Sequence, residues 1–316
     1  MSTLSSLLKP GHTAVVTGAS SGIGRAACLE FVKRGMNVWM IDIDEEQLQL
    51  AHSKVQETAV VTPSSETSQI IEYRVADVSS LQGMMAVADD VFTAAATKND
   101  AASCCCHVLM NNAGIGQGGG AMTNMETVHK VMGVNTYGPI HGCLTFVPKM
   151  KASGQPGIII NTGSKQGITM PPGNLTYNMS KAALKVYTEG LEHELRMERM
   201  EKGGKLRAAL LIPGWVNTSI VAKTIEAQGG NIADAPFHED KPATGAWMPH
   251  QVIEFMISEL DDHPDRFYVV CPDNDVDRAT DNLRMTWTMQ DITENRPPLS
   301  RWHPEYQEQF QQFLTK

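Results

Sequence analysis

Several features are absent from this sequence of 316 residues. No apolar run approaches the roughly 18 residues that a membrane-spanning helix needs. Basic residues are not in excess, because the formal net charge is -9 and the pI about 5.6, so the charge does not support nucleic acid or anionic lipid as a partner. The opening residues, MSTLSSLLKPGH, have neither a basic start nor a long apolar middle, and we expect no secretory signal.

The cysteines and histidines show no metal-binding pattern. Cys104, Cys105 and Cys106 are adjacent, adjacent cysteines can rarely pair with one another, and no second cluster stands at metal spacing. The histidines with no ligand spacing are His107, His129, His141 and His193. We therefore expect no catalytic metal, thiols that are small buried side chains, and a reducing, cytoplasmic compartment.

Seven apolar segments alternate with helical patterns. They span 13–18, 37–42, 70–77, 107–112, 157–164, 205–214 and 266–271. Strands that are apolar on both faces and are joined by helices form parallel sheets covered on both sides. The sequence therefore predicts an α/β fold of three layers, with a seven-stranded parallel sheet between helices.

The whole chain, 1–316, is predicted to be one domain with a core at 10–275. Within that core, 57–69 is rich in serine and threonine and is expected to be a surface loop, and 93–103 is expected to be a helix end followed by a polar connection. Neither segment is long enough to form a domain.

Two later segments depart from the regular alternation. The irregular segment 219–248 follows the carboxyl end of a strand, where such sheets bind ligands, and we expect it to be a variable substrate loop. A C-terminal extension follows at 276–316. Its paired prolines predict an extended, surface-wrapping conformation for 295–306.

A glycine-rich loop, TGASSGIG, covers 17–24 between the first strand and the first helix. Gly18 permits a tight turn, Gly22 allows the backbone to approach a pyrophosphate, and Gly24 lets the helix pack close to the sheet. The phosphates would meet free N–H groups at a helix N-terminus. Other candidate contacts in the loop are Ser20, Ser21 and Ile23. Glycines also close ordinary turns, but this pattern follows a strand and opens a helix, which is the context that nucleotide binding requires.

Acidic residues at the next strand ends extend the candidate cofactor site. Asp42, followed by Ile43, can accept hydrogen bonds from both ribose hydroxyls and would repel a 2′-phosphate, so we predict NAD(H) over NADP(H). Asp44 competes for this role, and Asp42 is alternatively a solvated strand-end acid. Asp77 and Val78 are expected to flank the adenine. Small residues approach the cofactor from the fourth strand: Asn112, Ala113 and Gly114.

Taken together, these residues resemble the short-chain dehydrogenase/reductase family of the single-domain Rossmann type. The resemblance covers most of 10–275 and rests on TGASSGIG (17–24), NNAG (111–114), Asn135, Ser164, YNMSK (177–181) and PG (213–214). It implies that Tyr177 is the general acid or base. It also implies that Ser164 orients and polarises the substrate carbonyl, and that Asn135 holds a water that relays protons to Lys181.

Lys181 lies one helical turn after Tyr177, so both side chains share a face. We expect the ammonium, together with the positive ring of a bound cofactor, to lower the pKa of Tyr177 and to hold the nicotinamide ribose. Taken alone, the two residues would more often be a pair on a helix surface, and only the combination with the other motifs favours catalysis.

The segment PGWVN (213–217) resembles the part of the family fold that covers the nicotinamide. The expected cofactor contacts are Tyr177, Lys181, Pro213, Gly214, Val216 and Thr218. Six apolar residues flank the expected active site: Met170, Pro171, Pro172, Trp215, Trp247 and Met248. They are candidates for the pocket lining, although core or interface positions are an equal alternative.

The sequence therefore predicts an NAD(H)-dependent oxidoreductase that interconverts a secondary alcohol and a ketone on a largely apolar small molecule. The alternatives are a non-redox enzyme on the same fold (dehydratase or epimerase) and a regulator that senses the dinucleotide without turnover. The family resemblance implies a homodimer or homotetramer.

Overall fold

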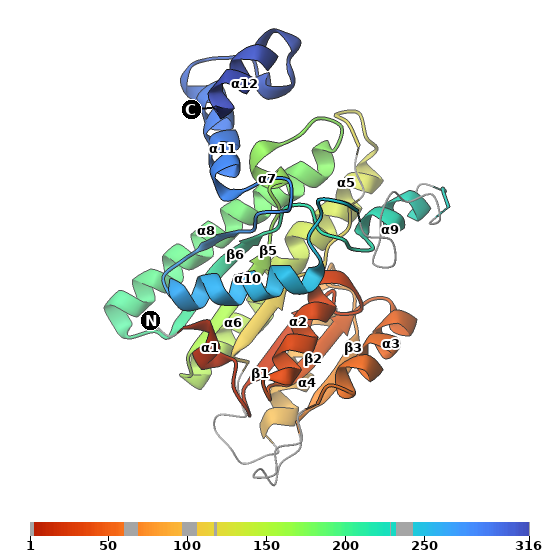
Figure 1. The fold of residues 1–316 in the computed structure, drawn as a ribbon. Helices are drawn as coiled ribbons and strands as arrows, with labels where there is room; N and C mark the ends of the chain where they lie inside the picture. The colour runs from red at the N-terminus through yellow and green to blue at the C-terminus, as the bar shows by residue number, and fades with distance from the viewer. Residues whose placement is uncertain are drawn as a thin grey trace.

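The structure is a computed structural model that describes residues 3–59, 69–96, 106–116, 119–227, 229–231 and 243–315. Its centre is a seven-stranded parallel sheet in the order β3-β2-β1-β4-β5-β6-β7 (Figure 1). The strands are β1 (Thr13–Thr17), β2 (Asn37–Asp42), β3 (Ile71–Val75), β4 (Val108–Asn111), β5 (Gly157–Thr162), β6 (Leu206–Ile212) and β7 (Tyr268–Val270). All seven predicted strands are confirmed.

Helices cover both faces of this sheet, as predicted. One apolar core joins the sheet to α1 (Leu4–Leu7), α2 (Gly22–Lys33), α3 (Glu45–Gln56) and α10 (Pro249–Asp262). The other joins it to α4 (Leu81–Ala96), α6 (Gly138–Ser153) and α8 (Leu175–Lys202). Every residue of β1, β4, β5 and β6 is buried, because side chains on both faces of these strands pack against helices. Three layers result.

The strand order reverses at β1, which pairs with β2 on one side and β4 on the other. Successive connections therefore leave in opposite directions from this point and open a crevice at the carboxyl ends of the strands. The glycine loop follows β1 directly and therefore lies at this crevice, where sheets of this kind bind ligands.

The segments expected to be irregular are only partly described. Residues 60–68 of the segment 57–69 lie outside the described residues, and so do residues 97–105, which include most of the segment 93–103. Cys104 and Cys105 fall in the latter group. Within 219–248 the chain forms α9 (Ile220–Ala227), whereas 228 and 232–242 lie outside the described residues. Four described cysteines are buried: Cys28, Cys106, Cys143 and Cys271.

The prediction that 295–306 is extended is wrong. The C-terminal extension contains α11 (Arg278–Thr293), two 3-10 turns, η3 (Ser300–Trp302) and η4 (Pro304–Tyr306), and α12 (Gln307–Leu314). Asp277 begins α11 by accepting a hydrogen bond from the Thr280 N–H at 2.8 Å. The paired prolines only form the connection between the two helices, which project beyond α7 (Gln166–Thr169) in Figure 1.

A small aromatic core explains why this extension folds back on itself. Trp287 is buried, and its ring lies 5.3 Å from the ring of Phe310 and 5.2 Å from that of Phe313. Its indole N–H donates to the Ser300 hydroxyl at 2.8 Å, and the Arg296 guanidinium stacks over the ring at 3.8 Å. The extension is therefore a packed helical unit.

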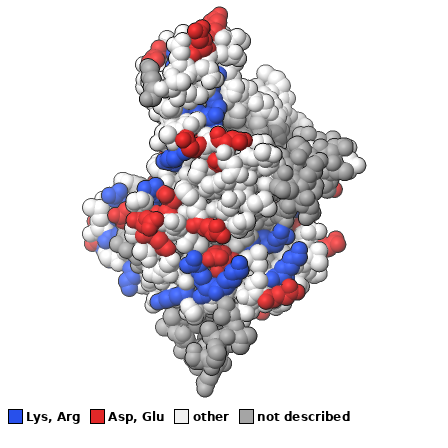
Figure 2. Space-filling model, in the orientation of Figure 1, with Lys and Arg blue, Asp and Glu red and all other residues white. Residues whose placement is uncertain are grey.

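Acidic and basic side chains are interspersed on the face shown in Figure 2. Among the helices that the structure describes, none is both long and apolar enough to cross a membrane.

Candidate active site

The glycine loop turns sharply from β1 into α2. Gly18 and Gly22 have φ values of 66° and 53°, in the left-handed region that favours glycine. A Cβ on Gly24 would lie 2.1 Å from the Gly18 carbonyl oxygen, so only glycine allows α2 to begin this close to the strand. The geometry is the one predicted for a phosphate-binding turn.

The loop after β6 lies over this turn. The hydroxyls of Ser21 and Ser219 are 3.1 Å apart, and a Cβ on Gly22 would lie 3.0 Å from the Thr218 methyl group. Thr218, predicted as a cofactor contact, therefore borders the same space as the glycine loop. Of the other loop residues, Ser20 and Ile23 are buried.

Asp42 ends β2 beside the glycine loop. One carboxylate oxygen accepts from the Ser20 N–H at 3.0 Å, and the other accepts from the N–H groups of Ile43 and Asp44 at 2.8 and 3.2 Å. The Ile43 side chain is 65% exposed. Asp44, the competing candidate, instead caps α3 by accepting from the Gln47 N–H at 3.2 Å.

The residues after β3 are placed by local contacts. The Asp77 carboxylate accepts from the N–H and the hydroxyl of Ser79 at 2.8 and 2.7 Å. Val78 is buried against Gly138, where a Cβ would approach the valine methyl group to 2.8 Å. His141 donates to the Val78 carbonyl at 2.9 Å. Both predicted adenine contacts thus stand at the carboxyl edge of the sheet.

Asn112 ties three strand ends together. Its amide nitrogen donates to the Thr17 carbonyl at 3.2 Å, and its amide oxygen accepts from the Thr162 hydroxyl at 3.2 Å. The Thr17 hydroxyl accepts in turn from the N–H groups of Asn112 and Ala113. A Cβ on Gly114 would lie 3.4 Å from Asn135 Oδ1 and 3.5 Å from Lys181 Nζ, so glycine leaves space above the lysine.

Lys181 is buried in α8, and its ammonium donates to the Thr162 carbonyl at the end of β5 at 2.8 Å. Tyr177 stands one turn earlier on the same helix, with its ring centroid 5.8 Å from Lys181 Nζ. The predicted shared face is confirmed.

Asn135 lies in a short π-helix, η1 (Gly133–Tyr137), between α5 (Met125–Met132) and α6. π-helical turns are frequent at functional sites. The Asn135 side chain accepts from the Ile115 N–H at 2.8 Å, donates to the Ile115 carbonyl at 2.9 Å and donates to the Ser180 hydroxyl at 3.1 Å. The amide is therefore fully held on the inner face of α8, one residue from Lys181.

Ser164 follows β5 and precedes α7. Its hydroxyl accepts from the Gln166 N–H at 3.1 Å and is hydrogen-bonded to Tyr177. The structure thus brings the four residues predicted as catalytic to one place: Asn135, Ser164, Tyr177 and Lys181.

The family model described as short chain dehydrogenase matches residues 12–229, more than half of the chain. The chain belongs to the short-chain dehydrogenase family. It is 30% identical to a cyclohexanol dehydrogenase from Rhodococcus sp., over 80% of this chain and 92% of that protein.

Solved structures of short-chain dehydrogenases and related enzymes share the fold. A short-chain dehydrogenase/reductase from Burkholderia phymatum, solved with NAD, is 26% identical, has a TM-score of 0.73, and covers 92% of this chain and 96% of its own. An alcohol dehydrogenase from Thermococcus sibiricus, solved with 5-hydroxy-NADP, is 20% identical, has a TM-score of 0.62, and covers 84% and 98%. The chain is therefore an oxidoreductase of this family, whose members bind NAD or NADP.

The residues at this edge of the short-chain dehydrogenase fit a dinucleotide. Gly18 and Gly22 hold the open turn, and Gly114 leaves space that a Cβ would fill. Ser20 Oγ is buried in the loop without a hydrogen-bond partner among the described residues. The exposed apolar surface of Ile43 lies directly beside Asp42, where an adenosine would contact it.

The predicted lowering of the Tyr177 pKa by Lys181 is wrong for the protein alone. Burial raises the pKa of Tyr177, and the hydrogen bond with Ser164 opposes this rise. Burial also lowers the pKa of Lys181 to about 8, because the ammonium loses hydration. The hydrogen bond from Ser164 thus favours the Tyr177 phenolate.

The expected pocket residues fall into two groups. Met170 and Trp215 are 39% and 43% exposed, on the turns that follow β5 and β6, and Pro171 and Pro172 follow Met170. Trp247 and Met248 make contacts with other parts of the protein. Trp247 packs against the core, and the Met248 sulfur accepts from the Asn217 amide at 3.3 Å. Both side chains are half-buried, and their place in the pocket lining stays a prediction.

The segment 213–217 is held against 245–248. Val216 pairs with Trp247 in an isolated parallel bridge, and Asn217 donates its N–H to the Trp247 carbonyl at 2.9 Å. Pro213 accepts from the Lys165 N–H at 3.3 Å, and a Cβ on Gly214 would lie 2.8 Å from Lys165 Nζ. Pro213, Gly214 and Val216 therefore border the site from the β6 side.

Sequence reasoning missed several residues that build this site. Thr17 and Thr162 hold Asn112 and Lys181, and Ser180 holds Asn135. A signal existed for each, because Thr17 precedes the first loop glycine, Thr162 ends a strand, and Ser180 precedes Lys181. In the part of the chain that the structure describes, no group of three His, Cys, Asp or Glu residues is placed to hold a metal ion.

Proposed function

We propose that the chain is an NAD(H)-dependent oxidoreductase that interconverts a secondary alcohol and a ketone. The observation that carries this proposal is the cluster of Ser164, Tyr177 and Lys181 beside the glycine loop, at the carboxyl edge of the sheet. A proton donor and a carbonyl-orienting hydroxyl are what ketone reduction requires beyond a source of hydride.

Each residue has a role that follows from its contacts. Tyr177 transfers the proton to or from the substrate oxygen, and Ser164, hydrogen-bonded to Tyr177, orients that oxygen. Lys181 is held by the Thr162 carbonyl, which leaves its remaining N–H donors for the ribose and for a water chain beside Asn135. The nicotinamide, when bound, supplies or accepts the hydride.

The preference for NAD(H) rests on Asp42. Its carboxylate stands beside the glycine loop and the exposed Ile43 side chain, where the adenosine ribose would lie. Within the described part of the chain no ion pair involves Asp42, and Lys223 pairs with Asp44 instead, at 3.6 Å. A ribose 2′-phosphate would therefore meet an unneutralised carboxylate at Asp42.

The substrate is proposed to be largely apolar, because Met170 and Trp215 are exposed on turns adjoining Ser164. Similarity to a cyclohexanol dehydrogenase makes alicyclic secondary alcohols the first candidates. A dinucleotide-sensing regulator is less well supported, because a sensor has no need of a placed proton donor, and a dehydratase or epimerase is the remaining alternative.

We further propose one catalytic domain with its core at 10–275, assembled as a homodimer or homotetramer in a reducing, cytoplasmic compartment. Leu81, Met85 and Leu144 on α4 and α6 are 40%, 53% and 58% exposed and line a common groove, which suits burial in a subunit contact. The mass in solution, from light scattering, tests this part of the proposal.

The reaction is tested by following NADH absorbance with a panel of ketones, including cyclohexanone, and the reverse reaction with the alcohols and NAD. We expect turnover with NADH to exceed that with NADPH. A substrate that is altered without any NADH change would favour the dehydratase or epimerase, and dinucleotide binding without any chemistry would favour the sensor.

A further inference from the structure

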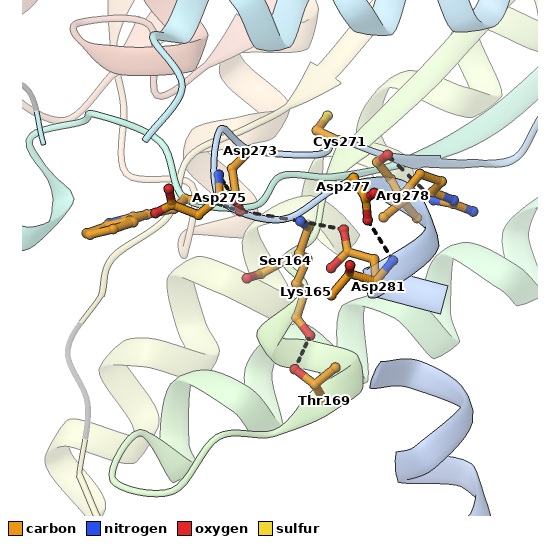
Figure 3. A network of polar contacts seen from close by, with 12 residues as sticks. Ser164, Lys165, Thr169, Cys271, Asp273, Asp275, Asp277, Arg278 and Asp281 are labelled. Atoms are coloured by element: carbon orange, nitrogen blue, oxygen red, sulfur yellow. Dashed lines mark hydrogen bonds and ion pairs between the residues drawn. The ribbon is translucent and has the colours of Figure 1, made fainter. Parts of the chain in front are cut away.

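Lys165 directly follows Ser164, and its ammonium is held by two acids from distant parts of the chain. Lys165 Nζ lies 2.5 Å from Asp281 Oδ2 and 3.4 Å from Asp273 Oδ2. All three side chains are shielded, with exposed fractions of 14% for Lys165, 4% for Asp281 and 8% for Asp273. Figure 3 shows Nζ between the two acids, with the Ser164 hydroxyl directed away from them. A pair this buried is costly to break, because the remaining charge is left unpaired.

The backbone of Lys165 belongs to the same turn as Ser164. The Ser164 carbonyl accepts from the Gly167 N–H at 3.0 Å, and the Lys165 carbonyl accepts from the Thr169 N–H at 2.9 Å and from its hydroxyl at 3.1 Å. With the bond from Gln166 to the Ser164 hydroxyl, these contacts form one compact helical turn. A shift of the Lys165 side chain is therefore passed to Ser164 through two adjacent backbone units.

Asp273 connects this turn to the segment that borders the cofactor space. Its carboxylate also accepts from the Trp215 N–H at 3.3 Å. A Cβ on Gly214 would lie 2.6 Å from Asp273 Oδ2 and 2.8 Å from Lys165 Nζ. The acid thus joins the turns that carry Ser164 and Trp215, and any lysine displaced toward Asp273 would press on Gly214.

Asp281 comes from α11 in the C-terminal extension. Met285, one turn further on the same helix, packs with Ile168 of α7 against the apolar cluster at β6 and β7. The aromatic core around Trp287 then holds α11 against α12. The helix that presents Asp281 is therefore anchored through its middle turns, one to two turns after the carboxylate.

We propose that Asp281, acting through Lys165, is a positioning residue for Ser164, so that the C-terminal extension forms part of the active-site framework. This inference rests on the proposed function of Ser164. Without the Asp281 carboxylate, Lys165 keeps only the more distant Asp273, is drawn toward Gly214, and moves the serine turn relative to Tyr177. Small displacements of a group that orients substrate are enough to reduce the rate strongly.

The test is Asp281→Asn in the full-length protein, with ketone reduction and NADH binding measured separately. We expect kcat/KM for the ketone to fall about tenfold, mainly through kcat, because orientation of the carbonyl is lost. The dissociation constant for NADH should stay within about twofold, because the glycine loop is untouched. Asp281→Glu, which keeps the carboxylate, should recover part of the rate.

Asp291→Asn is the matched control on the same helix. Asp291 pairs with Arg296 at 3.1 Å and accepts from the Ser300 N–H at 3.1 Å, within the extension. It has no contact with Lys165, and Met285 still anchors α11 near Asp281, so kcat/KM should fall much less than in Asp281→Asn. An equal loss of activity in this control would overturn the positioning role, because general destabilisation would then explain both variants.

A Ser164→Ala background separates this inference from the proposed function. If Asp281 acts through Ser164, Asp281→Asn should add little to the loss caused by Ser164→Ala. A full tenfold further loss in that background, or no loss in the single variant, contradicts the positioning role. Unimpaired turnover in Ser164→Ala alone contradicts the proposed function instead.

The double variant Lys165→Met with Asp281→Asn guards against misfolding of the single variant, because it removes both charges of the closer ion pair and leaves Asp273 hydrogen-bonded to the Trp215 N–H. We expect it to fold with a lowered kcat. Wild-type activity in this double variant would also overturn the inference.

Discussion

Replacing Asp42 with asparagine should reverse the cofactor preference. The two side chains have nearly the same shape, but an asparagine cannot present two accepting oxygens. One carboxylate oxygen of Asp42 accepts hydrogen bonds from the Ile43 and Asp44 N–H groups. The other accepts from the Ser20 N–H at 3.0 Å. In the variant an amide NH₂ must face one set of these donors, so the contact with the glycine loop is the one we expect to be lost.

Three contributions set the size of the effect. A backbone donor left without its acceptor costs about 1–3 kcal/mol, and a hydrogen bond from a ribose hydroxyl to a charged acceptor is worth about 1.5–3 kcal/mol. Together these two losses, about 2.5–6 kcal/mol, should weaken NADH binding by about 100-fold or more. For NADPH, the repulsion between two unit charges about 4 Å apart, near 4 kcal/mol at a protein surface, is relieved and offsets this loss.

The assay is kcat/KM for NADH and NADPH at a fixed ketone concentration, with both dissociation constants measured directly. We expect the NADH-to-NADPH ratio to fall by at least about 100-fold in Asp42→Asn. Asp44→Asn is the matched control, because asparagine caps a helix as well as aspartate does, and its ratio should not change. A ratio that falls in the control and not in Asp42→Asn would refute the reasoning and assign the ribose to Asp44.

Two further predictions concern pH. In Ser164→Ala, the rise of residual alcohol oxidation with pH should move to higher pH, because the serine hydrogen bond lowers the pKa of Tyr177; an unmoved profile would contradict that link. Burial, and secondarily the charge of Lys9, hold the pKa of His12 below 6.5, so the unfolded chain binds more protons and stability falls as pH drops from 6.5 through the folded pKa. The urea midpoint of unfolding should therefore change more between about pH 7.5 and about pH 5.5 in the wild type than in His12→Gln. An equal change in both proteins would show that His12 does not cause the pH dependence of stability.

The strands and the cofactor loop were predictable from sequence because their signals are local. Strands buried on both faces read as short apolar runs, and β1 is followed at once by the glycines that its turn requires. The catalytic residues were predictable as a group for a related reason. Ser164 follows β5 directly, and the carboxyl ends of parallel strands meet at one edge, so a strand-end residue in such a sheet has a known place.

What escaped prediction depends on contacts between distant parts of the chain. The sign of the Tyr177 pKa shift is set by burial, which no spacing reveals. The helices of the C-terminal extension were hidden by the paired prolines, since the aromatic core around Trp287 forms only when α12 folds back on α11. The ion pair between Lys165 and Asp281 likewise joins residues that only the fold brings together.

The central claim is that Tyr177 transfers the proton in a hydride-transfer reaction, and Tyr177→Phe tests it most directly. The variant removes one hydroxyl and keeps the ring beside Lys181. Turnover of the best ketone should fall by about 10³-fold or more, while the dissociation constant for NADH stays within about twofold of the wild type. Turnover that survives the loss of this hydroxyl, with NADH still bound, would contradict the account.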